Sequence, residues 1–344
     1  MEKTDKIIVG ISVGDINGIG IEIILKTFED KRMLDFCTPV IFASNRLISF
    51  HKKNLKLNNS IHSIHSTDKI THGKINLVNI WKEEVKIEVG KSTGNGGKYA
   101  FKSLEAATKA LKNNHVDILL TAPINKDTIQ SEDFKFPGHT EYLQDNLDGK
   151  SLMILMTDEL RVGLITGHIP VSKVSETITP ELIQEKVEIM HKSLVEDFAI
   201  SKPKIAILGL NPHCGDNGII GSEDNEIVRP TITEIKKTGK MVFGPYAADG
   251  FFGSKTYKQF DGVLAMYHDQ GLAPFKALSF GNGVNYTAGL NKVRTSPDHG
   301  TGFDIAGKNK ANPDSFKEAL FTSLHIYKNR NEYQELTKNK LPVK

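Results

Sequence analysis

The sequence has few cysteines and no long apolar run, and each absence excludes a class of protein. Its 344 residues include only Cys37 and Cys214, so we predict no disulfide framework and expect a reducing, cytoplasmic location. No stretch approaches the ~18 consecutive apolar residues of a membrane-spanning helix. Residues 1–6 are charged and lack the apolar core of a signal peptide, so neither secretion nor a membrane partner is expected.

An excess of charge of one sign is also missing. The 44 Lys and Arg residues nearly balance the 41 Asp and Glu residues, and the net charge is +3. A protein that binds nucleic acid through bulk charge carries a larger basic excess, so no nucleic-acid partner is expected. The composition, 39% hydrophobic and 25% charged, is that of an ordinary globular protein. At ~100–200 residues per domain, the length predicts two domains or lobes.

The first motif is a strand, a glycine-rich turn and a helix. The apolar run 6–13 predicts a buried strand, and the helical pattern 21–28 follows Gly14–Gly20. Such a turn can cradle a phosphate at a helix N-terminus, but its spacing is not the G-x-G-x-x-G of Rossmann folds, and a plain tight turn is an equal alternative. Gly90-Lys91-Ser92 is not a P-loop either, because Val85 stands where the motif needs its first glycine.

Further apolar runs alternate with helical patterns and predict an α/β protein with a mixed, mostly parallel sheet. Two of the predicted strands, 153–157 and 162–166, flank a short turn and predict an antiparallel hairpin. Residues 51–88 are polar, and we predict surface strands and loops there, with solvated histidines such as His51. The remaining predicted strands are 39–43, 116–121, 204–210 and 263–267, and the helices are 97–114, 180–194 and one that starts at Asn312-Pro313.

Three histidines each follow a predicted strand. His168 follows 162–166, His213 follows 204–210 and His268 follows 263–267. Open α/β sheets bind ligands beyond the carboxyl ends of their strands, so the three imidazoles are candidates for a metal site with a position left open. Imidazole nitrogens suit Zn, Co, Ni or Fe better than Ca. An ordinary loop histidine is the alternative for each residue taken alone.

Two polar clusters add candidate binding residues. His139 and Thr140 lie in a turn, Pro137–Glu141, that predicts a polar recognition loop. Lys276 and Arg294 flank a glycine-rich stretch and are candidates for holding a phosphate or carboxylate, with solvated surface charge as the alternative.

Six runs of the sequence resemble those of one family, the 4-hydroxythreonine-4-phosphate dehydrogenases of pyridoxal phosphate biosynthesis, across about residues 7–325. The most specific are Met266-Tyr267-His268-Asp269-Gln270-Gly271 and Thr295-Ser296-Pro297-Asp298-His299-Gly300-Thr301. The others are residues 14–20, 121–126, 137–141 and 210–213. Residues 299–308 and 311–313 are also similar to the NAD loop of isocitrate and isopropylmalate dehydrogenases.

The resemblance implies a two-lobed α/β/α fold, like that of isopropylmalate dehydrogenase and not of the Rossmann type. An NAD-binding lobe would comprise residues 1–130 and 275–344. A lobe for metal, substrate and dimerisation would comprise residues 131–274. Three residues depart from the family pattern: Ile16 and Ile21 stand where prolines are usual, and Gly302 stands where alanine is usual. Cys214 follows His213. Two readings are open for it: a thiol near the metal that is sensitive to oxidation, or a small side chain that only fills space.

The resemblance also assigns roles to single residues. His168, His213 and His268 would bind one divalent cation, Zn, Mg or Co, at a site shared across a homodimer interface, with His268 from the second protomer. The catalytic base would be His139 or Asp249. Substrate contacts would come from His139, Thr140, Lys276, Asn285 and Arg294. The NAD contacts, with NADP left open, would come from Asp298, His299, Gly300, Thr301 and Asp304.

The implied reaction is the NAD-dependent oxidation of 4-phosphooxy-L-threonine, a small phosphorylated hydroxy amino acid. Its product, 2-amino-3-oxo-4-phosphooxybutanoate, decarboxylates to 3-amino-2-oxopropyl phosphate. Dehydrogenases of 4-phosphoerythronate or 4-phosphothreonate share the metal and phosphate residues, and they remain an alternative. A non-catalytic metal- or phosphate-binding homologue is the second alternative.

Overall fold

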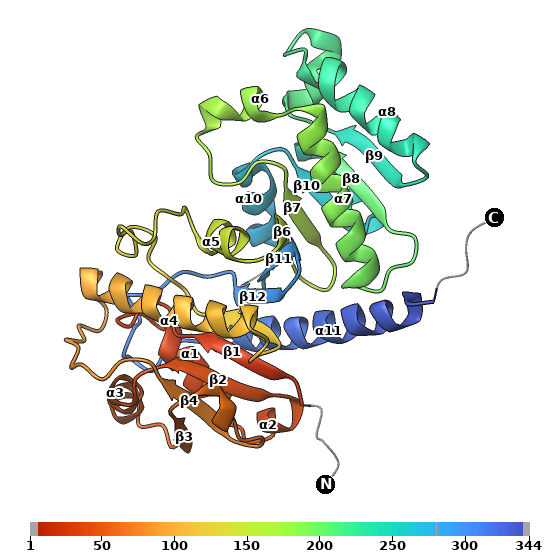
Figure 1. Cartoon of the computed structure of the whole chain (residues 1–344). Coiled ribbons are helices and arrows are strands. Elements are labelled where there is room, and N and C mark those ends of the chain that lie inside the picture. Colours follow the sequence, from red (N-terminus) through yellow and green to blue (C-terminus); the bar gives the residue numbers. More distant parts are fainter. Residues whose placement is uncertain (1–5, 280, 340–344) are drawn as a thin grey trace. The chain divides into compact units, whose positions relative to one another are not determined.

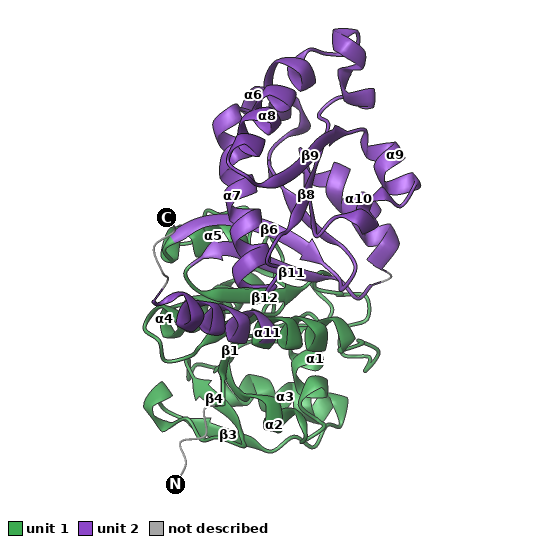
Figure 2. Ribbon diagram, turned by 90° about the vertical axis from the view of Figure 1, so that its right-hand side faces the viewer, with its two compact units in different colours: residues 1–148, 291–324 green, residues 149–290, 325–344 purple. Residues whose placement is uncertain are grey.

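The computed structural model describes residues 6–279 and 281–339, which form an α/β protein (Figure 1). The chain divides into two compact units (Figure 2). Unit 1 comprises residues 1–148 and 291–324, and unit 2 comprises residues 149–290 and 325–344. None of the helices in the described residues is long and apolar enough to cross a membrane.

These units differ from the predicted lobes at residues 131–148, 275–290 and 325–344. Residues 131–148 stay with unit 1 because the helix α5 (His139–Asn146) contacts α4 (Gly94–Lys112). Residues 275–290 stay with unit 2 because the strand β11 (Val284–Leu290) pairs with β6 (Gly149–Met156). The assignment of cofactor and substrate to one lobe each remains a prediction.

The strands of unit 1 form a parallel sheet. Its order is β3 (Ile61–Ile64), β4 (Ile75–Asn79), β2 (Thr38–Ala43), β1 (Ile8–Ser12), β5 (Ile118–Thr121) and β12 (Val293–Pro297). The other helices of unit 1 are α1 (Gly20–Thr27), α2 (Met33–Phe36), α3 (Asn45–Leu55) and the first part of α11 (Asp314–Thr337). Figure 2 shows α1 and α4 on opposite sides of β1, so the sheet is covered on both faces.

Two predictions for unit 1 are confirmed and one is wrong. The strand, glycine turn and helix lie where the sequence predicts them, and the face of α4 that carries Leu104 and Leu111 is fully buried. Residues 51–88 are not simply a surface region, because β4 is buried and His51 is 2% exposed. His51 Nε2 lies 2.9 Å from the carbonyl oxygen of Ile16. The polar composition of the segment concealed this buried strand.

Unit 2 contains a mixed sheet. Its order is β11, β6, β7 (Arg161–Leu164), β10 (Gly262–Ala265), β8 (Lys204–Leu208) and β9 (Met241–Tyr246). The pairs β11–β6 and β6–β7 are antiparallel, which confirms the predicted hairpin, and the remaining pairs are parallel. The helices of unit 2 are α6 (Val174–Thr177), α7 (Pro180–Glu196), α8 (Arg229–Lys237), α9 (Ala248–Gly253), α10 (His268–Ser279) and the end of α11.

A buried polar network fixes the end of α11 within unit 2. Arg330 Nε donates to Asp197 Oδ1 at 2.8 Å, and Arg330 Nη2 donates to the Tyr286 hydroxyl at 2.9 Å. The same hydroxyl donates to Asp197 Oδ2 at 2.5 Å. Burial and the charge of Asp197 raise the pKa of Tyr286 well above its ordinary value. The last part of α11 therefore belongs to unit 2 and not to the predicted NAD lobe.

Candidate active site

The three predicted metal-binding histidines follow three neighbouring parallel strands. β10 lies between β7 and β8 and is parallel to both. His168 follows β7, His268 follows β10 and His213 follows β8. All three therefore come from the carboxyl ends of adjacent strands, which is the edge of an α/β sheet where ligands bind.

Hydrogen bonds fix the chain at this edge of unit 2. Gln270 Oε1 accepts from Met266 N at 2.7 Å, and its Nε2 donates to the oxygen of Gly209 at 2.6 Å, so it ties the end of β10 to the end of β8. Thr166 Oγ1 donates to the oxygen of Met266 at 2.6 Å, which ties β10 to β7. Asp224 accepts from Leu210 N at 2.8 Å and holds the turn after β8.

Two of the histidines are close together in one chain. The ring centroids of His168 and His268 lie 5.3 Å apart, and His268 Nδ1 lies 2.7 Å from Asp269 Oδ1. A carboxylate behind a histidine is a common way to orient a metal ligand. Within residues 6–279 and 281–339, no group of three or more His, Cys, Asp or Glu side chains is placed to hold a metal ion. One chain alone therefore does not complete the predicted three-histidine site.

His213 begins a turn with unusual backbone geometry. Residues 213–218 all have positive φ angles, from +41° at Asp216 to +98° at Gly218. Side chains other than glycine rarely adopt this left-handed conformation, and the strain it stores is characteristic of functional sites. The turn leaves His213 exposed and buries Cys214, whose pKa is raised by its burial.

In unit 1, Arg294 lies on β12 and is 1% exposed. Both its Nε and its Nη2 donate to Thr121 Oγ1, at 3.1 and 2.6 Å, where β5 ends. Burial lowers the pKa of the guanidinium to about 9, and the charge of Glu141 opposes that shift. A buried guanidinium is costly to desolvate, so this position is suited to bind an anion that compensates for the cost.

His139 opens α5 in the same unit. Its Nε2 atom is buried and has no hydrogen-bond partner within the described part of the chain. Burial lowers the pKa of the imidazole well below 6.5, and the charges of Arg294 and Lys126 lower it further. The ring is therefore neutral at pH 7, and Nε2 is available to a ligand. Thr140 is 8% exposed and is the next residue of the helix.

Sequence reasoning did not single out Thr121, Lys126 and Glu141 as members of this cluster. All three lie inside runs that resemble the family, 121–126 and 137–141. The signal was therefore present, but a threonine at a strand end, a lysine in a loop and a glutamate in a helix have no distinctive spacing of their own.

The remaining predicted substrate residues lie in unit 2. Lys276 is exposed on α10, two turns after His268. Asn285 lies on β11, and its Oδ1 is buried without a hydrogen-bond partner within the described residues. Asp249 is exposed on α9, and its charge raises the pKa of Cys214, so it lies on the side of unit 2 that carries the His213 turn.

The predicted NAD residues form one loop of unit 1 that follows β12. Ile19 N donates to the oxygen of Thr301 at 2.9 Å, so the glycine-rich turn after β1 supports this loop. His299 Nε2 is buried and has no hydrogen-bond partner in the part of the chain that the structure describes. A buried nitrogen of this kind fits a bound polar ligand. The other members are Asp298, Gly300 and Asp304, of which Gly300 and Asp304 are exposed.

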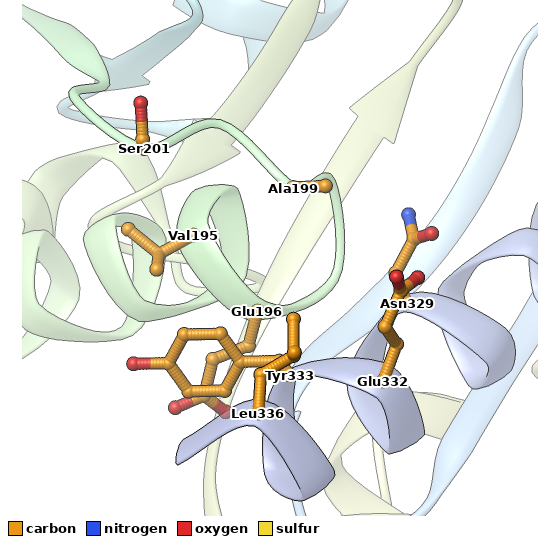
Figure 3. A pocket seen from close by; sticks show the side chains of 8 residues that line it. All are labelled: Val195, Glu196, Ala199, Ser201, Asn329, Glu332, Tyr333 and Leu336. Carbon is orange, nitrogen blue, oxygen red and sulfur yellow. The ribbon is translucent and has the colours of Figure 1, made fainter. Parts of the chain in front are cut away.

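A separate cavity of about 420 Å³ in unit 2 contains none of the predicted site residues (Figure 3). Its lining comes from the end of α7, the loop that leads to β8, and α11. Because this loop enters β8 at its amino end, the cavity lies at the edge of the sheet opposite to the histidines. The cavity is lined by Val195, Glu196, Ala199, Ser201, Asn329, Glu332, Tyr333 and Leu336.

Residues 35–323 match the family model described as "Pyridoxal phosphate biosynthetic protein PdxA". The chain belongs to the PdxA family. This confirms the resemblance read from the six sequence runs. Members of the PdxA family carry the dehydrogenase name that the resemblance suggested.

Two such relatives are similar along nearly the whole chain. The 4-hydroxythreonine-4-phosphate dehydrogenase of Bacteroides thetaiotaomicron is 50% identical over 98% of this chain and 94% of its own length. The protein of the same name from Sulfurihydrogenibium sp. is 42% identical over 90% of this chain and 95% of its own length.

Solved structures support the same PdxA fold. The crystal structure of 4-hydroxythreonine-4-phosphate dehydrogenase from Klebsiella pneumoniae is 31% identical, covers 95% of this chain and 99% of its own, and has a TM-score of 0.79. A terephthalate 1,2-cis-dihydrodiol dehydrogenase from Burkholderia xenovorans, 24% identical with a TM-score of 0.62 over 93% of this chain and 98% of its own, shares the fold. The mixed α/β fold class is thus confirmed, and the likeness to isopropylmalate dehydrogenase stays a prediction.

Proposed function

We propose that this protein is a 4-hydroxythreonine-4-phosphate dehydrogenase. It would oxidise the C3 hydroxyl of 4-phosphooxy-L-threonine with NAD, and the keto acid formed would lose carbon dioxide. Membership of the PdxA family and the names of relatives that match almost the full chain support this reaction. The observation that carries the proposal is the buried Arg294 beside a neutral His139, which together suit an anionic substrate that carries a proton to be removed.

The anion would bind in unit 1. The buried guanidinium of Arg294 would compensate charge on the phosphate or carboxylate of the substrate, and α5 adds the positive end of its dipole, next to Thr140. Lys276 and Asn285 lie in unit 2 and are proposed as substrate contacts from the resemblance alone. The Oδ1 of Asn285, which is buried without a hydrogen-bond partner in the part of the chain that the structure describes, suits the ammonium group of an amino acid.

The donor set at the strand ends of unit 2 suits a divalent cation such as Zn or Co, and Mg stays open from the resemblance alone. Neutral imidazoles from His168, His213 and His268 would hold it. The cation, when bound, supplies Lewis-acid polarisation of the hydroxyl and the nascent ketone. The chain's own contribution is to hold the ends of β7, β8 and β10, the strands that precede the three ligands, through the hydrogen bonds of Gln270 and Thr166.

The loop of residues 298–304 would hold the adenosine part of NAD, with NADP open as an alternative. The buried Nε2 of His299, which has no hydrogen-bond partner among the described residues, offers a hydrogen bond to the nucleotide. His139 is the better candidate for the general base, because its lowered pKa keeps the imidazole neutral at pH 7 and its buried Nε2 has no hydrogen-bond partner within the described residues. Asp249 is an alternative base on unit 2.

We also infer a homodimer that closes the site. The aliphatic side chains of Ile169, Val171, Ile219 and Ile220 are exposed, and Val171 and Ile219 are 77% and 82% exposed. These residues follow His168 and His213, and a 2.6 Å hydrogen bond from Ser175 to Glu223 ties the two segments together. Exposed apolar side chains next to polar site residues are typical of an interface. A second copy would cover them and bring in the missing ligand.

A substrate panel with NAD and a divalent cation tests the function. The protein should form NADH with 4-phosphooxy-L-threonine at a kcat/KM well above that for 4-phosphoerythronate and 4-phosphothreonate. A preference for either hydroxy acid would favour the alternative dehydrogenase. No NADH from any of the three, with a folded protein and bound cation, would favour a non-catalytic homologue.

A further inference from the structure

Asn17 is fully buried and connects the glycine-rich turn after β1 to the segment that leads into α4. Its Oδ1 accepts from Glu88 N, its main-chain oxygen accepts from Gly90 N, and its Nδ2 donates to Thr93 Oγ1, each at 2.8 Å. Thr93 is also the N-cap of α4 and accepts from Gly96 N at 3.1 Å. Asn17 thus determines the path of residues 88–93.

Residues 88–90 in turn lie against residues 303–307. A Cβ atom on Gly90 would lie 2.9 Å from the oxygen of Phe303, and one on Gly307 would lie 2.6 Å from Val89 Cγ1. Both glycines have positive φ angles, +81° and +72°. Only glycine allows so close an approach in this conformation, so the two segments are in direct contact. Gly90 is therefore needed for this close packing, although it does not belong to a P-loop.

The turn that carries Asn17 makes a second contact with the same loop. Ile19 N donates to the oxygen of Thr301 at 2.9 Å. A Cβ atom on Gly302 would lie 2.9 Å from Ile19 Cδ1. The loop of residues 298–307 is therefore held by residue 19 and by residues 89–90, and Asn17 joins these two supports.

We propose that residues 88–90 form a second wall of the cofactor site, and that Asn17 is the positioning residue that keeps this wall and the loop of residues 298–307 in the conformation that binds the dinucleotide. The inference rests on the proposed function, which places NAD at this loop. A glycine-rich loop loses conformational freedom when it binds a ligand. Contacts that order the loop beforehand reduce this cost and raise the affinity.

Asn76 offers a matched control for the substitution Asn17→Ala. It is also a fully buried asparagine of unit 1, and it also fixes a loop. Its Oδ1 accepts from Thr71 N at 2.9 Å, and its Nδ2 donates to the oxygens of Thr71 and Lys74 at 3.0 and 3.1 Å. Those residues precede β4, whereas Asn17 follows β1, and the strands are parallel. The two asparagines therefore fix loops at opposite edges of the same sheet.

The experiment measures the dissociation constant of NADH by fluorescence titration, the steady-state constants, and amide hydrogen exchange of the protein without cofactor. Asn17→Ala should weaken NADH binding about ten-fold or more, because the loop must then be ordered on binding. kcat at saturating NAD and KM for the phosphorylated substrate should stay unchanged. Exchange should accelerate in residues 88–93 and 298–307. Asn76→Ala should accelerate exchange near Thr71 and leave NADH affinity unchanged.

Unchanged NADH affinity in Asn17→Ala, or an equal loss in Asn76→Ala, would overturn the inference. If Asn17→Ala does not fold, Val89→Ala replaces it, because this half-buried side chain contacts Gly307 directly. Unchanged NADH affinity in Val89→Ala would then be decisive against the second wall. A wild-type protein that neither binds nor reduces NAD would contradict the proposed function instead. In that case, the rate of amide hydrogen exchange in residues 298–307, compared between Asn17→Ala and the wild type, would still show whether Asn17 orders the loop.

Discussion

Arg294 directs two of its nitrogen atoms, Nε and Nη2, to a single acceptor, Thr121 Oγ1, at the buried end of β5. The hydroxyl fixes the plane of the guanidinium, and the charge of Glu141 offsets only part of the effect of burial. Burial consequently lowers the pKa of Arg294 to about 9. A side chain held so rigidly and at such an electrostatic cost is suited to recognise a planar or tetrahedral anion.

The first prediction follows from this geometry. Arg294→Lys keeps a positive charge but loses the planar set of N–H donors of the guanidinium. A charge-assisted hydrogen bond contributes about 1.5–3 kcal/mol, so KM for the phosphorylated substrate should rise about ten-fold or more. Steady-state kinetics with varied substrate measures the effect. Arg330→Lys is the matched control, since Arg330 is a partly buried arginine of unit 2, with a side chain 12% exposed, that is paired with Asp197. It should lower the free energy of unfolding and leave KM unchanged. An unchanged KM in Arg294→Lys would remove Arg294 from the site.

The second prediction concerns acid stability. Burial lowers the pKa of His51 from 6.5 to about 4, so the unfolded chain binds a proton there more readily than the folded chain. The stability that depends on neutral His51 is therefore fully present above pH 6.5 and is lost as the pH falls towards 4. The loss should reach about 2 kcal/mol at pH 5.

Urea unfolding at pH 7.5 and pH 5 measures this loss. His51→Gln keeps a hydrogen-bond donor for the oxygen of Ile16 but does not titrate, so its stability should fall less between the two pH values. The pKa of Asp15 is raised to about 6 by burial, and its opposite contribution is common to both proteins. His65→Gln, at an exposed position, should behave as the wild type does. The same acid loss in His51→Gln would show that other groups cause it.

The third prediction addresses Gly302, which lies in the predicted NAD loop. Its φ is +54°, and a Cβ atom would lie 2.9 Å from Ile19 Cδ1. Gly302→Ala should therefore lower the free energy of unfolding by about 1–2 kcal/mol. Gly300→Ala is the control in the same loop, because no atom lies within 4 Å of its Cβ position. Its effect should stay below about 0.5 kcal/mol. Equal stability of Gly302→Ala and the wild type would mean that this loop adjusts freely.

The sequence predicted the parts of the molecule that rest on local patterns. The strand, turn and helix at residues 6–28, the helix that starts at residue 180, and three histidines at strand ends follow from apolar periodicity and position. The sequence did not predict that β10 lies between β7 and β8, because strand order is set by tertiary packing. This order is what places the three histidines at one edge.

The sequence also did not indicate the burial of polar residues whose hydrogen-bond partners lie far along the chain. His51 and Asn17 look like loop residues in the sequence, yet both are buried by contacts with segments more than 30 residues away. No spacing rule indicates such partners. The compact units divide the chain at other residues than the predicted lobes for the same reason, since Arg330 reaches Asp197 across 133 residues.

The last prediction concerns which chains supply the metal ligands. The resemblance implies that His168 and His213 come from one protomer and His268 from its partner, whereas the 5.3 Å separation of the His168 and His268 rings in one chain suggests a different grouping. Alanine variants of the three histidines, each inactive alone, can be mixed in pairs and allowed to exchange subunits. In a two-fold dimer, two ligands from different chains leave one intact site in each mixed dimer.

If His268 is the ligand from the partner, His268→Ala should restore activity with either other variant, to about a quarter of all sites, because random exchange makes about half of the dimers mixed. His168→Ala and His213→Ala together should restore none. Elemental analysis should show the same fraction of sites refilled with metal, which separates metal binding from turnover. If instead only the pairs that include His213→Ala recover, His168 and His268 act from one chain, as their ring separation suggests. If no pair recovers while mass spectrometry confirms exchange, the metal ligands are not shared between protomers, and the inferred two-chain site is wrong.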